Sequence, residues 1–134
     1  MNNLIELRKK IKIFSVLIVD DEIDVLDRSV IFLKKFFNNI ESANDAKEAL
    51  EKFQNNNGYD IVITDIMMPE ISGWELIRQL RIIDNNIFIV AMSGSPEITN
   101  EETNSTDIFL KKPIDIDKML KIFDKIIQKK EIKL

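Results

Sequence analysis

Short apolar runs alternate with amphipathic segments along most of this chain, a pattern that predicts strands alternating with helices. The expected strands are residues 14–19, 40–43, 61–63, 87–92 and 108–111. The expected helices are residues 22–37, a segment from 45 to the breaker at 55–58, residues 72–83 and residues 115–130. Strands that are apolar on both faces need helices above and below them, so the predicted fold class is α/β, a doubly wound parallel sheet of five strands.

Apolar residues at helical spacing indicate which face of each expected helix is buried. The residues expected on these faces are Ile23, Leu26, Val30, Leu33 and Phe37; Ala46, Ala49, Leu50 and Phe53; Leu76, Ile77 and Leu80; and Met119, Leu120, Phe123 and Ile127. Because packing supplies most of the stability of a helix in a protein, these faces are expected to cover the two sides of the sheet.

Two segments depart from this alternation. Residues 1–12 are expected to be an N-terminal extension that could form a short helix with one apolar face. In residues 94–107 the only large apolar side chain is Ile98, so a helix there would have little to bury, and we expect it to be short or poorly formed. The rest of the chain is interpreted as one domain over residues 13–130, followed by a tail of residues 131–134.

Composition narrows the function classes. The 134 residues are 45% hydrophobic and 31% charged, as in a globular protein, and the formal net charge of −4 argues against nucleic-acid binding by bulk electrostatics. Basic residues gather near both ends, and we interpret them as solvated faces. The chain has no cysteine and no histidine, which excludes thiolate chemistry and the commonest acid–base group. No run resembles a leader or a membrane span, so a cytoplasmic protein is expected.

Polar residues follow four of the expected strands: Asp20 and Asp21, Asp65, Ser93 and Lys112. Open α/β sheets bind ligands at the carboxyl ends of their strands, and in a sheet of order 2-1-3-4-5 the three acids would converge there. Two carboxylates about 4 Å apart repel by about 4 kcal/mol at an effective dielectric constant of about 20, so a compensating cation is expected. The available ligands are oxygens, which favour Mg²⁺, while Lys112 and Ser93 suit the oxygens of a phosphoryl group.

Taken singly, these residues could be a helix cap, turn residues and a solvated lysine, but together with their neighbours they resemble a known family. The resemblance is carried by Val19–Glu22, Thr64–Pro69, Ser72–Leu76, Ser93 and Phe109–Pro113. These motifs are similar to those of response regulator receiver domains of two-component signalling, of the single-domain chemotaxis type. The resemblance covers about residues 13–130 and implies a flavodoxin-like sheet of order 2-1-3-4-5.

The resemblance also implies a role for each acid. Asp65 would be the phosphoacceptor, attacking a phosphohistidine to form an aspartyl phosphate. Asp21 and Asp65 would bind Mg²⁺ directly, together with the backbone carbonyl of Met67, and Asp20 would act mainly through water. Mg²⁺ is therefore the expected cofactor, and the phosphoprotein would form only in its presence.

Further roles follow from the same resemblance. Ser93 would hydrogen-bond the phosphoryl group and act as a switch residue, and Lys112 would pair with the phosphoryl oxygens. Lys111 is expected to lie outside the site. Phe109 matches the aromatic switch position, or is simply a half-buried strand residue. The Lys112–Pro113 peptide bond is expected to be cis, at a cost of about 0.5–1 kcal/mol.

Two features differ from the family pattern. The segment between Ser93 and Phe109 is shorter than usual by about one helical turn. Gly94 replaces the small alanine that normally follows the hydroxyl residue. Both features lie on the face that family members use for output, so the mode of output is left open while the phosphorylation chemistry is expected to be retained.

The expected function is that of a single-domain response regulator that accepts a phosphoryl group on Asp65 and then changes its binding to a downstream protein. The donor would be a histidine kinase, a histidine phosphotransfer protein or a small acyl phosphate, because this chain has no histidine. It would catalyse only its own phosphorylation and dephosphorylation, and no nucleic-acid or membrane partner is expected. A phosphorelay intermediate and a receiver-like docking module that works without phosphorylation remain as alternatives.

Two rival classes fit less well. A phosphatase of the haloacid dehalogenase type needs two acids separated by one residue after the first strand, whereas Asp20 and Asp21 are adjacent. A flavodoxin-like nucleotide binder needs a glycine-rich loop for the phosphate, and no such loop follows the first strand.

Overall fold

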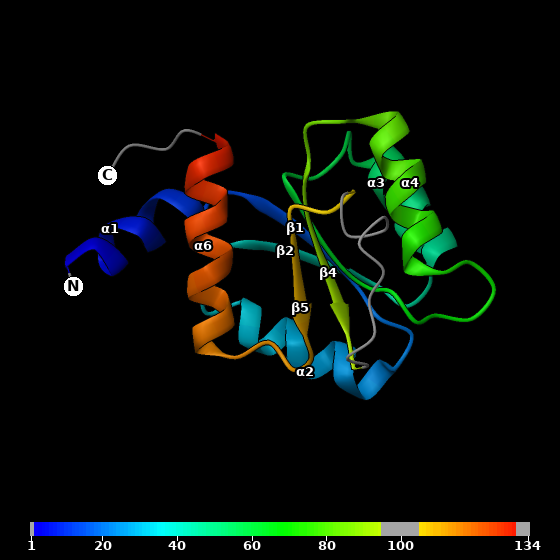
Figure 1. Ribbon diagram of the computed structural model, residues 1–134, viewed down its shortest axis with the longest axis horizontal. Helices are drawn as coiled ribbons and strands as arrows, with labels where there is room; N and C mark the ends of the chain where they lie inside the picture. Colours follow the sequence, from blue (N-terminus) through cyan, green and yellow to red (C-terminus); the bar gives the residue numbers. More distant parts are fainter. Residues whose placement is uncertain (1, 95–104, 131–134) are drawn as a thin grey trace.

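The computed structural model describes residues 2–94 and 105–130, which form a five-stranded parallel sheet with helices on both faces (Figure 1). The strands are β1 (Ser15–Val19), β2 (Asn39–Ala43), β3 (Ile61–Asp65), β4 (Phe88–Ser93) and β5 (Ile108–Lys111). The helices are α1 (Asn2–Ile11), α2 (Ile23–Leu33), α3 (Ala46–Asn55), α4 (Gly73–Ile83) and α6 (Ile116–Lys130). The strand order is β2-β1-β3-β4-β5, which confirms the predicted doubly wound fold.

The apolar runs become the inner strands of the sheet. Every residue of β3 and β4 is buried, whereas the edge strand β2 alternates between exposed and covered positions. In the parallel register Val19 of β1 lies opposite Thr64 of β3, and Asp65 lies opposite Met92 of β4. The strands therefore end level with one another, and the residues that follow them share one edge of the sheet.

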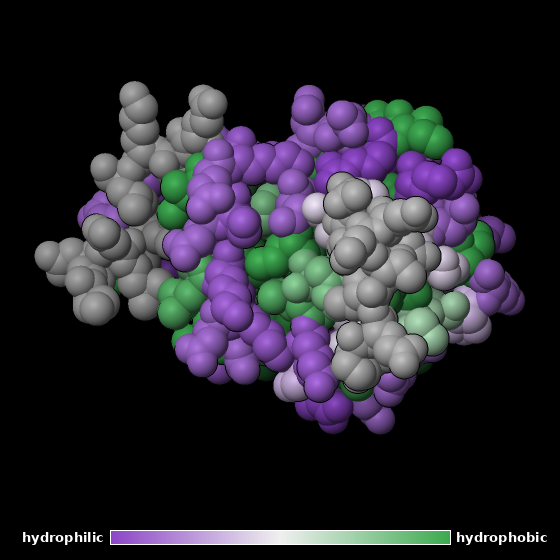
Figure 2. Space-filling model, viewed as in Figure 1, coloured by the Kyte–Doolittle hydropathy of each residue, from purple (hydrophilic) through white to green (hydrophobic). Residues whose placement is uncertain are grey.

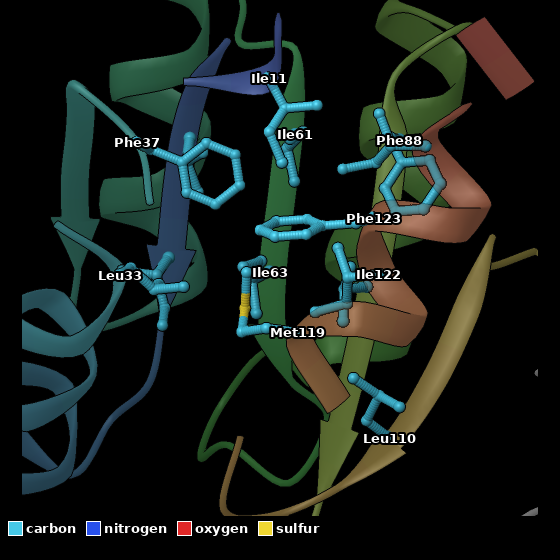
Figure 3. Close-up of a cluster of buried hydrophobic side chains, with 14 of the residues drawn as sticks. Ile11, Leu33, Phe37, Ile61, Ile63, Phe88, Leu110, Met119, Ile122 and Phe123 are labelled. Atoms are coloured by element: carbon cyan, nitrogen blue, oxygen red, sulfur yellow. The ribbon is translucent and has the colours of Figure 1, made fainter. Parts of the chain in front are cut away.

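The helices form two layers. One layer, with α2 and α6, packs over side chains such as Phe37, Ile63 and Phe123, and the ring of Phe123 lies between α6 and the sheet (Figure 3). The other layer, with α3 and α4, packs around Phe53 and Leu76 on the opposite face. The outer face of α6 is hydrophilic in the space-filling view, as its amphipathic pattern predicts (Figure 2).

The N-terminal extension is helical, as the sequence suggests. Helix α1 projects from one end of the molecule, and its last residue, Ile11, is fully buried in the same layer as α2 and α6 (Figures 1 and 3). Within the described ranges, no helix is both long enough and apolar enough to cross a bilayer. Most of the expected short helix at residues 94–107 falls on residues 95–104, which lie outside the described residues.

Two of the expected helix faces were partly wrong. Helix α2 ends at Leu33 rather than at residue 37, and Ile23 is 57% exposed because, as the first residue of the helix, it packs in neither of the two core clusters. In α6 the buried stripe runs through Met119, Ile122, Phe123 and Ile126, and Leu120 projects to its side with 39% exposure. At about 100° per residue, Leu120 lies too far round the helix to share that stripe.

Candidate functional site

The structure brings the three predicted acids together at the carboxyl edge of the sheet. Asp20 follows β1 and is fully buried, Asp65 is the last residue of β3 and is 4% exposed, and Asp21 is half-buried. One carboxylate oxygen of each acid lies within 4.8 Å of the others. Because β1 and β3 are neighbours at the point where the strand order reverses, this is the place where doubly wound sheets bind ligands.

Lys112 brings a cation to the acids from the far side of the sheet, just after β5. Its Nζ lies 2.7 Å from Oδ2 of Asp20 and 3.2 Å from Oδ2 of Asp65. Oδ2 of Asp20 is buried, and this ammonium group is its one polar contact among the described residues. We call Asp20, Asp21, Asp65 and Lys112 the acid site; it holds three carboxylates and one cation, so negative charge remains uncompensated.

Backbone groups orient the carboxylates. The N–H of Glu22 donates to Oδ1 of Asp20 at 3.0 Å, and the N–H of Met67 donates to Oδ1 of Asp65 at 3.2 Å. In both Asp20 and Asp65, one carboxylate oxygen accepts a hydrogen bond from the loop after its own strand, and the other oxygen lies near Lys112. The Met67 side chain is 69% exposed, so Met67 contributes to the site through its backbone.

Burial and charge act in opposite directions on the acid site. Burial raises the pKa of the Asp65 carboxyl above its ordinary value, although the Met67 N–H and the Lys112 ammonium act against that rise. Burial alone lowers the pKa of Lys112, but hydrogen bonds and attraction from Asp20 and Asp65 outweigh it, and the pKa stays above its ordinary value. Lys112 therefore remains a cation next to a carboxylate that is costly to ionise.

Ser93 and Lys112 are held next to each other by the backbone. Ser93 ends β4, is fully buried and lies one residue past Met92, which is paired with Asp65. The N–H of Lys112 donates to the carbonyl of Ser93 at 2.8 Å. The predicted Ser93 and Lys112 are therefore placed at the same edge as the three acids.

The start of α4 is packed against the backbone of Asp65. Gly73 donates its N–H to the carbonyl of Ile66 at 3.0 Å, and a Cβ at Gly73 would lie 2.2 Å from the carbonyl oxygen of Asp65. Only glycine fits this approach, which fixes the loop that follows the phosphoacceptor candidate. Gly73 belongs to one of the family motifs but was not predicted to have a role, and its only signal in the sequence is a glycine directly after the helix cap Ser72.

The remaining predicted residues lie beside the acid site. Phe109 of β5 is partly buried and stacks on Trp74, with ring centroids 6.1 Å apart and an angle of 20° between the rings. Lys111 is exposed, and the structure shows no contact between its ammonium and the three acids. The Lys112–Pro113 peptide bond is cis, which confirms that prediction.

A groove opens beside the acid site. It has a volume of about 410 Å³, and its lining includes Glu22, Arg28 and Phe32 from the α2 side and the segment from Lys112 to Ile114 from the β5 side. Apolar side chains form most of its wall, and Lys112 is shared with the acid site. The groove therefore adjoins the acid site at Lys112.

The donor set of the acid site fits a magnesium ion. Three carboxylates converge, a buried oxygen of Asp20 has only Lys112 as a partner among the described residues, and the chain contains no histidine or cysteine to favour a softer metal. Asp20, Asp21 and Asp65 are the side chains that could hold it. The adjacent Lys112 ammonium shows that the site already attracts positive charge.

Comparisons with known proteins agree with this arrangement. The family model described as "response regulator receiver domain" matches residues 16–124. The transcriptional regulatory protein TrcR of Mycobacterium tuberculosis is 29% identical over 108 residues, which cover 78% of this chain and 42% of TrcR. The curated relatives TrcR, the CpxR homologue of Haemophilus influenzae and SaeR of Staphylococcus epidermidis are all matched over less than half of their own length.

Solved structures show the same fold. A response regulator receiver domain protein from Clostridium thermocellum is 25% identical, with a TM-score of 0.79, covering 89% of this chain and 98% of that one. The response regulator TrrA from Thermotoga maritima, solved in complex with Mg²⁺-BeF, is 26% identical, with a TM-score of 0.74, covering 85% and 99%. With the family match, the fold and the acids in place, this chain belongs to the response regulator receiver domain family.

Proposed function

We propose that this chain is a magnesium-dependent phosphoacceptor whose acceptor is Asp65. The observation that carries the proposal is the acid site: Asp65 ends the central strand, two further carboxylates lie beside it, and Lys112 contacts its Oδ2 at 3.2 Å. The donor would be the phosphohistidine of a histidine kinase or phosphotransfer protein, or a small acyl phosphate, because this chain contains no histidine. The groove beside Lys112 would admit the donor from the α2 side.

In the proposed reaction a carboxylate oxygen of Asp65 attacks the phosphorus atom of the donor. The P–N bond of the phosphohistidine breaks, the imidazole leaves with the bonding electron pair, and an aspartyl phosphate remains on the chain. Mg²⁺, when bound by Asp20, Asp21, Asp65 and the Met67 carbonyl, would supply positive charge next to the transferring oxygens. Lys112 would pair with one phosphoryl oxygen and the Ser93 hydroxyl would donate to another.

The same residues would allow the phosphoryl group to be lost again to water, so the chain would act on its own phosphate and on no outside metabolite. The phosphoryl group would recruit Ser93 and Lys112, whose backbones are joined at 2.8 Å. Phe109 lies three residues before Lys112 and stacks on Trp74, so a shift of these residues would alter the surface next to α4. A downstream protein would read that altered surface.

The direct test is phosphate incorporation followed by intact mass. The protein is incubated briefly with acetyl phosphate, with Mg²⁺ or with EDTA, and the mass of one added phosphate is expected only with Mg²⁺. Asp65→Asn should gain none, whereas Asp124→Asn, which changes an exposed aspartate on α6, should match the wild type. A wild-type chain that gains no phosphate from acetyl phosphate or from a phosphorylated donor protein would contradict the proposal and favour a docking role without phosphorylation.

A further inference from the structure

A second charged site lies at the opposite edge of the sheet. Where the carboxyl ends of α1 and α2 meet, a pocket of about 220 Å³ is lined by the basic residues Arg8, Lys9, Lys12, Lys34 and Lys35 and by the apolar side chains of Ile5 and Phe36. We call this the basic pocket. Helix α1 leads into β1 and α2 leads into β2, so the basic pocket borders the amino ends of these strands, whereas the acid site lies at the carboxyl ends (Figure 1).

The walls of the basic pocket are held by contacts in the fold. Ile11, at the end of α1, is fully buried in the core, and the N–H of Asn38 donates to the carbonyl of Lys12 at 2.9 Å. Nη2 of Arg8 donates to the carbonyl of Lys35 at 2.5 Å, and its guanidinium lies 5.7 Å from the centre of the Phe36 ring. These contacts join the loop after α1 to the loop after α2, so the pocket is formed before any ligand arrives.

The basic pocket concentrates positive charge that no described residue of its lining neutralises. None of its lining residues is acidic, although the whole chain carries a net charge of −4. Lys9, Lys12 and Lys34 are exposed, and their ammonium groups form no ion pair or hydrogen bond with any side chain or backbone group that the structure describes. By contrast, two lysines elsewhere in the fold form ion pairs: Lys112 with Asp20 and Asp65, and Lys129 with Asp107.

The attraction of cations to helix carboxyl ends explains only part of this gathering. Arg8 already donates to a carbonyl after α2, and cation–π contacts of Arg8 with Phe36 and of Lys35 with Phe32 account for the positions of these two cations. Lys9, Lys12 and Lys34 add like charge around the same pocket and have no partner among the described residues, which costs stability unless an anion binds there.

We propose that the basic pocket binds a phosphate-bearing anion. Ammonium groups of Lys9, Lys12 and Lys34 would contact the phosphate oxygens, and Ile5, which is 61% exposed, and Phe36 would pack against the part of the ligand that carries the phosphate. The volume of about 220 Å³ suits one phosphate group with a small carrier rather than a length of nucleic-acid backbone. A free phosphorylated small molecule and a lipid with a phosphate monoester head group share this chemistry.

Titration calorimetry with inorganic pyrophosphate tests the free ligand, and co-sedimentation with phosphatidylcholine vesicles containing phosphatidic acid tests the lipid. Both are run with EDTA, so that the acid site does not bind a metal–phosphate complex. The variant Lys9→Gln/Lys12→Gln/Lys34→Gln should lose affinity for the probe that binds by about tenfold or more, as expected for the loss of charge-assisted hydrogen bonds.

A matched variant removes the same charge elsewhere. Lys47→Gln/Lys121→Gln/Lys125→Gln changes three exposed lysines that do not line the pocket, and it should bind the probe within about twofold of wild type, since only long-range attraction is lost. Asp65→Asn should bind as the wild type does, which separates this proposal from the phosphoacceptor function. Equal weakening of both triple variants, failure of both probes to bind, or tighter binding of duplex DNA than of either probe would overturn the proposal.

Discussion

Two clusters of carboxylates and cations lie at opposite ends of this sheet, and they are built in opposite proportions. The acid site has three carboxylates around one cation, Lys112. The second cluster, which we call the Asp107 clamp, has one carboxylate between two cations: Nη2 of Arg81 lies 3.0 Å from Oδ2 of Asp107, and Nζ of Lys129 lies 2.9 Å from Oδ1. In the acid site the negative charge of the carboxylates exceeds the positive charge of Lys112. In the Asp107 clamp both carboxylate oxygens of Asp107 are paired with a cation.

The Asp107 clamp ties together elements that are far apart in the sequence. Asp107 precedes β5; its carboxylate accepts the N–H of Ile89 in β4 at 2.7 Å, and its own N–H donates to the carbonyl of Ile89 at 2.9 Å. Arg81 comes from α4 and Lys129 from α6, and both also donate to the carbonyl of Ile87. The clamp therefore joins both helix layers to the sheet.

The two clusters are expected to serve different purposes, the Asp107 clamp stability and the acid site function. Asp107 is a carboxylate whose partners are all supplied by the fold, so we expect it to stabilise the native state. Burial raises the pKa of the Asp65 carboxyl, and the Met67 N–H and Lys112 do not fully offset that rise, so we expect its charge to cost stability. Because the fold does not fully compensate the negative charge of the acid site, this site can bind a metal ion and a phosphoryl group.

The largest expected effect comes from breaking the Asp107 clamp. Asp107→Ala should lower the free energy of unfolding by about 3 kcal/mol, because it leaves two cations and the Ile89 N–H without their acceptor at a largely covered position. Urea unfolding measures this loss. Asp124→Ala on the exposed face of α6 serves as the control and should change stability by less than about 0.5 kcal/mol. If Asp107→Ala is as stable as the wild type, the Asp107 clamp does not stabilise the native state.

The next effect concerns the support of the acid site. Gly73→Ala should lower the free energy of unfolding by about 1–3 kcal/mol, because its Cβ would lie 2.2 Å from the Asp65 carbonyl oxygen, and it should slow phosphate incorporation by displacing Asp65. Gly94→Ala is the matched control, because no atom of the described residues lies within 4 Å of a Cβ there. If both variants behave alike in urea unfolding and in phosphate incorporation, the close approach of α4 to Asp65 has no consequence.

Magnesium should stabilise the protein through the acid site. At an ion concentration about ten times the dissociation constant, the free energy of unfolding should rise by about 1.4 kcal/mol, since the ion binds the native state only. Thermal unfolding with and without Mg²⁺ measures the rise, and Asp21→Asn should reduce it because one carboxylate of the cluster is lost. Asp124→Asn is the control and should keep the full stabilisation by Mg²⁺. If Mg²⁺ stabilises Asp21→Asn as much as the wild type, Asp21 is not a ligand of the ion.

The smallest expected effect is a pH-dependent change in stability when Asp65 is replaced. Asp65→Asn should raise the free energy of unfolding at pH 7 by up to about 1 kcal/mol. The folded-state pKa of Asp65 is raised above its ordinary value of 3.8, so the cost of its charge is fully present above the folded pKa and disappears as the pH falls below 3.8. The gain of the variant over wild type should therefore shrink between about pH 7 and pH 4. Urea unfolding across this range checks it, and a gain that grows on acidification would reverse the assigned direction.

The sequence predicted the fold and most of the acid site because both depend on short-range patterns. β3 and β4 are apolar runs buried on both faces, and Asp65 and Lys112 each stand where such a run ends. The Asp107 clamp escaped prediction because its partners lie 26 and 22 residues away and share no motif. Gly73 escaped for a related reason, since the clash that requires glycine is with the backbone of another segment.

Helix faces were the least predictable part. Ile23 and Leu120 have the spacing of core residues, but Ile23 is the first residue of α2 and belongs to neither core cluster, and Leu120 lies at the side of the stripe that α6 presents. Exposure of this kind depends on where the sheet ends and how each helix is rotated against it. Neither quantity is encoded in the apolar spacing of a single helix.

The most direct test of the phosphoacceptor account is to locate the phosphate on the chain. After reaction with acetyl phosphate and Mg²⁺, borohydride reduces an aspartyl phosphate to homoserine, and peptide mass spectrometry then identifies the altered residue. We predict homoserine at position 65 alone, and none when Mg²⁺ is withheld. Homoserine at Asp20 or Asp21, or an unaltered Asp65 in protein whose intact mass shows an added phosphate, would contradict the account.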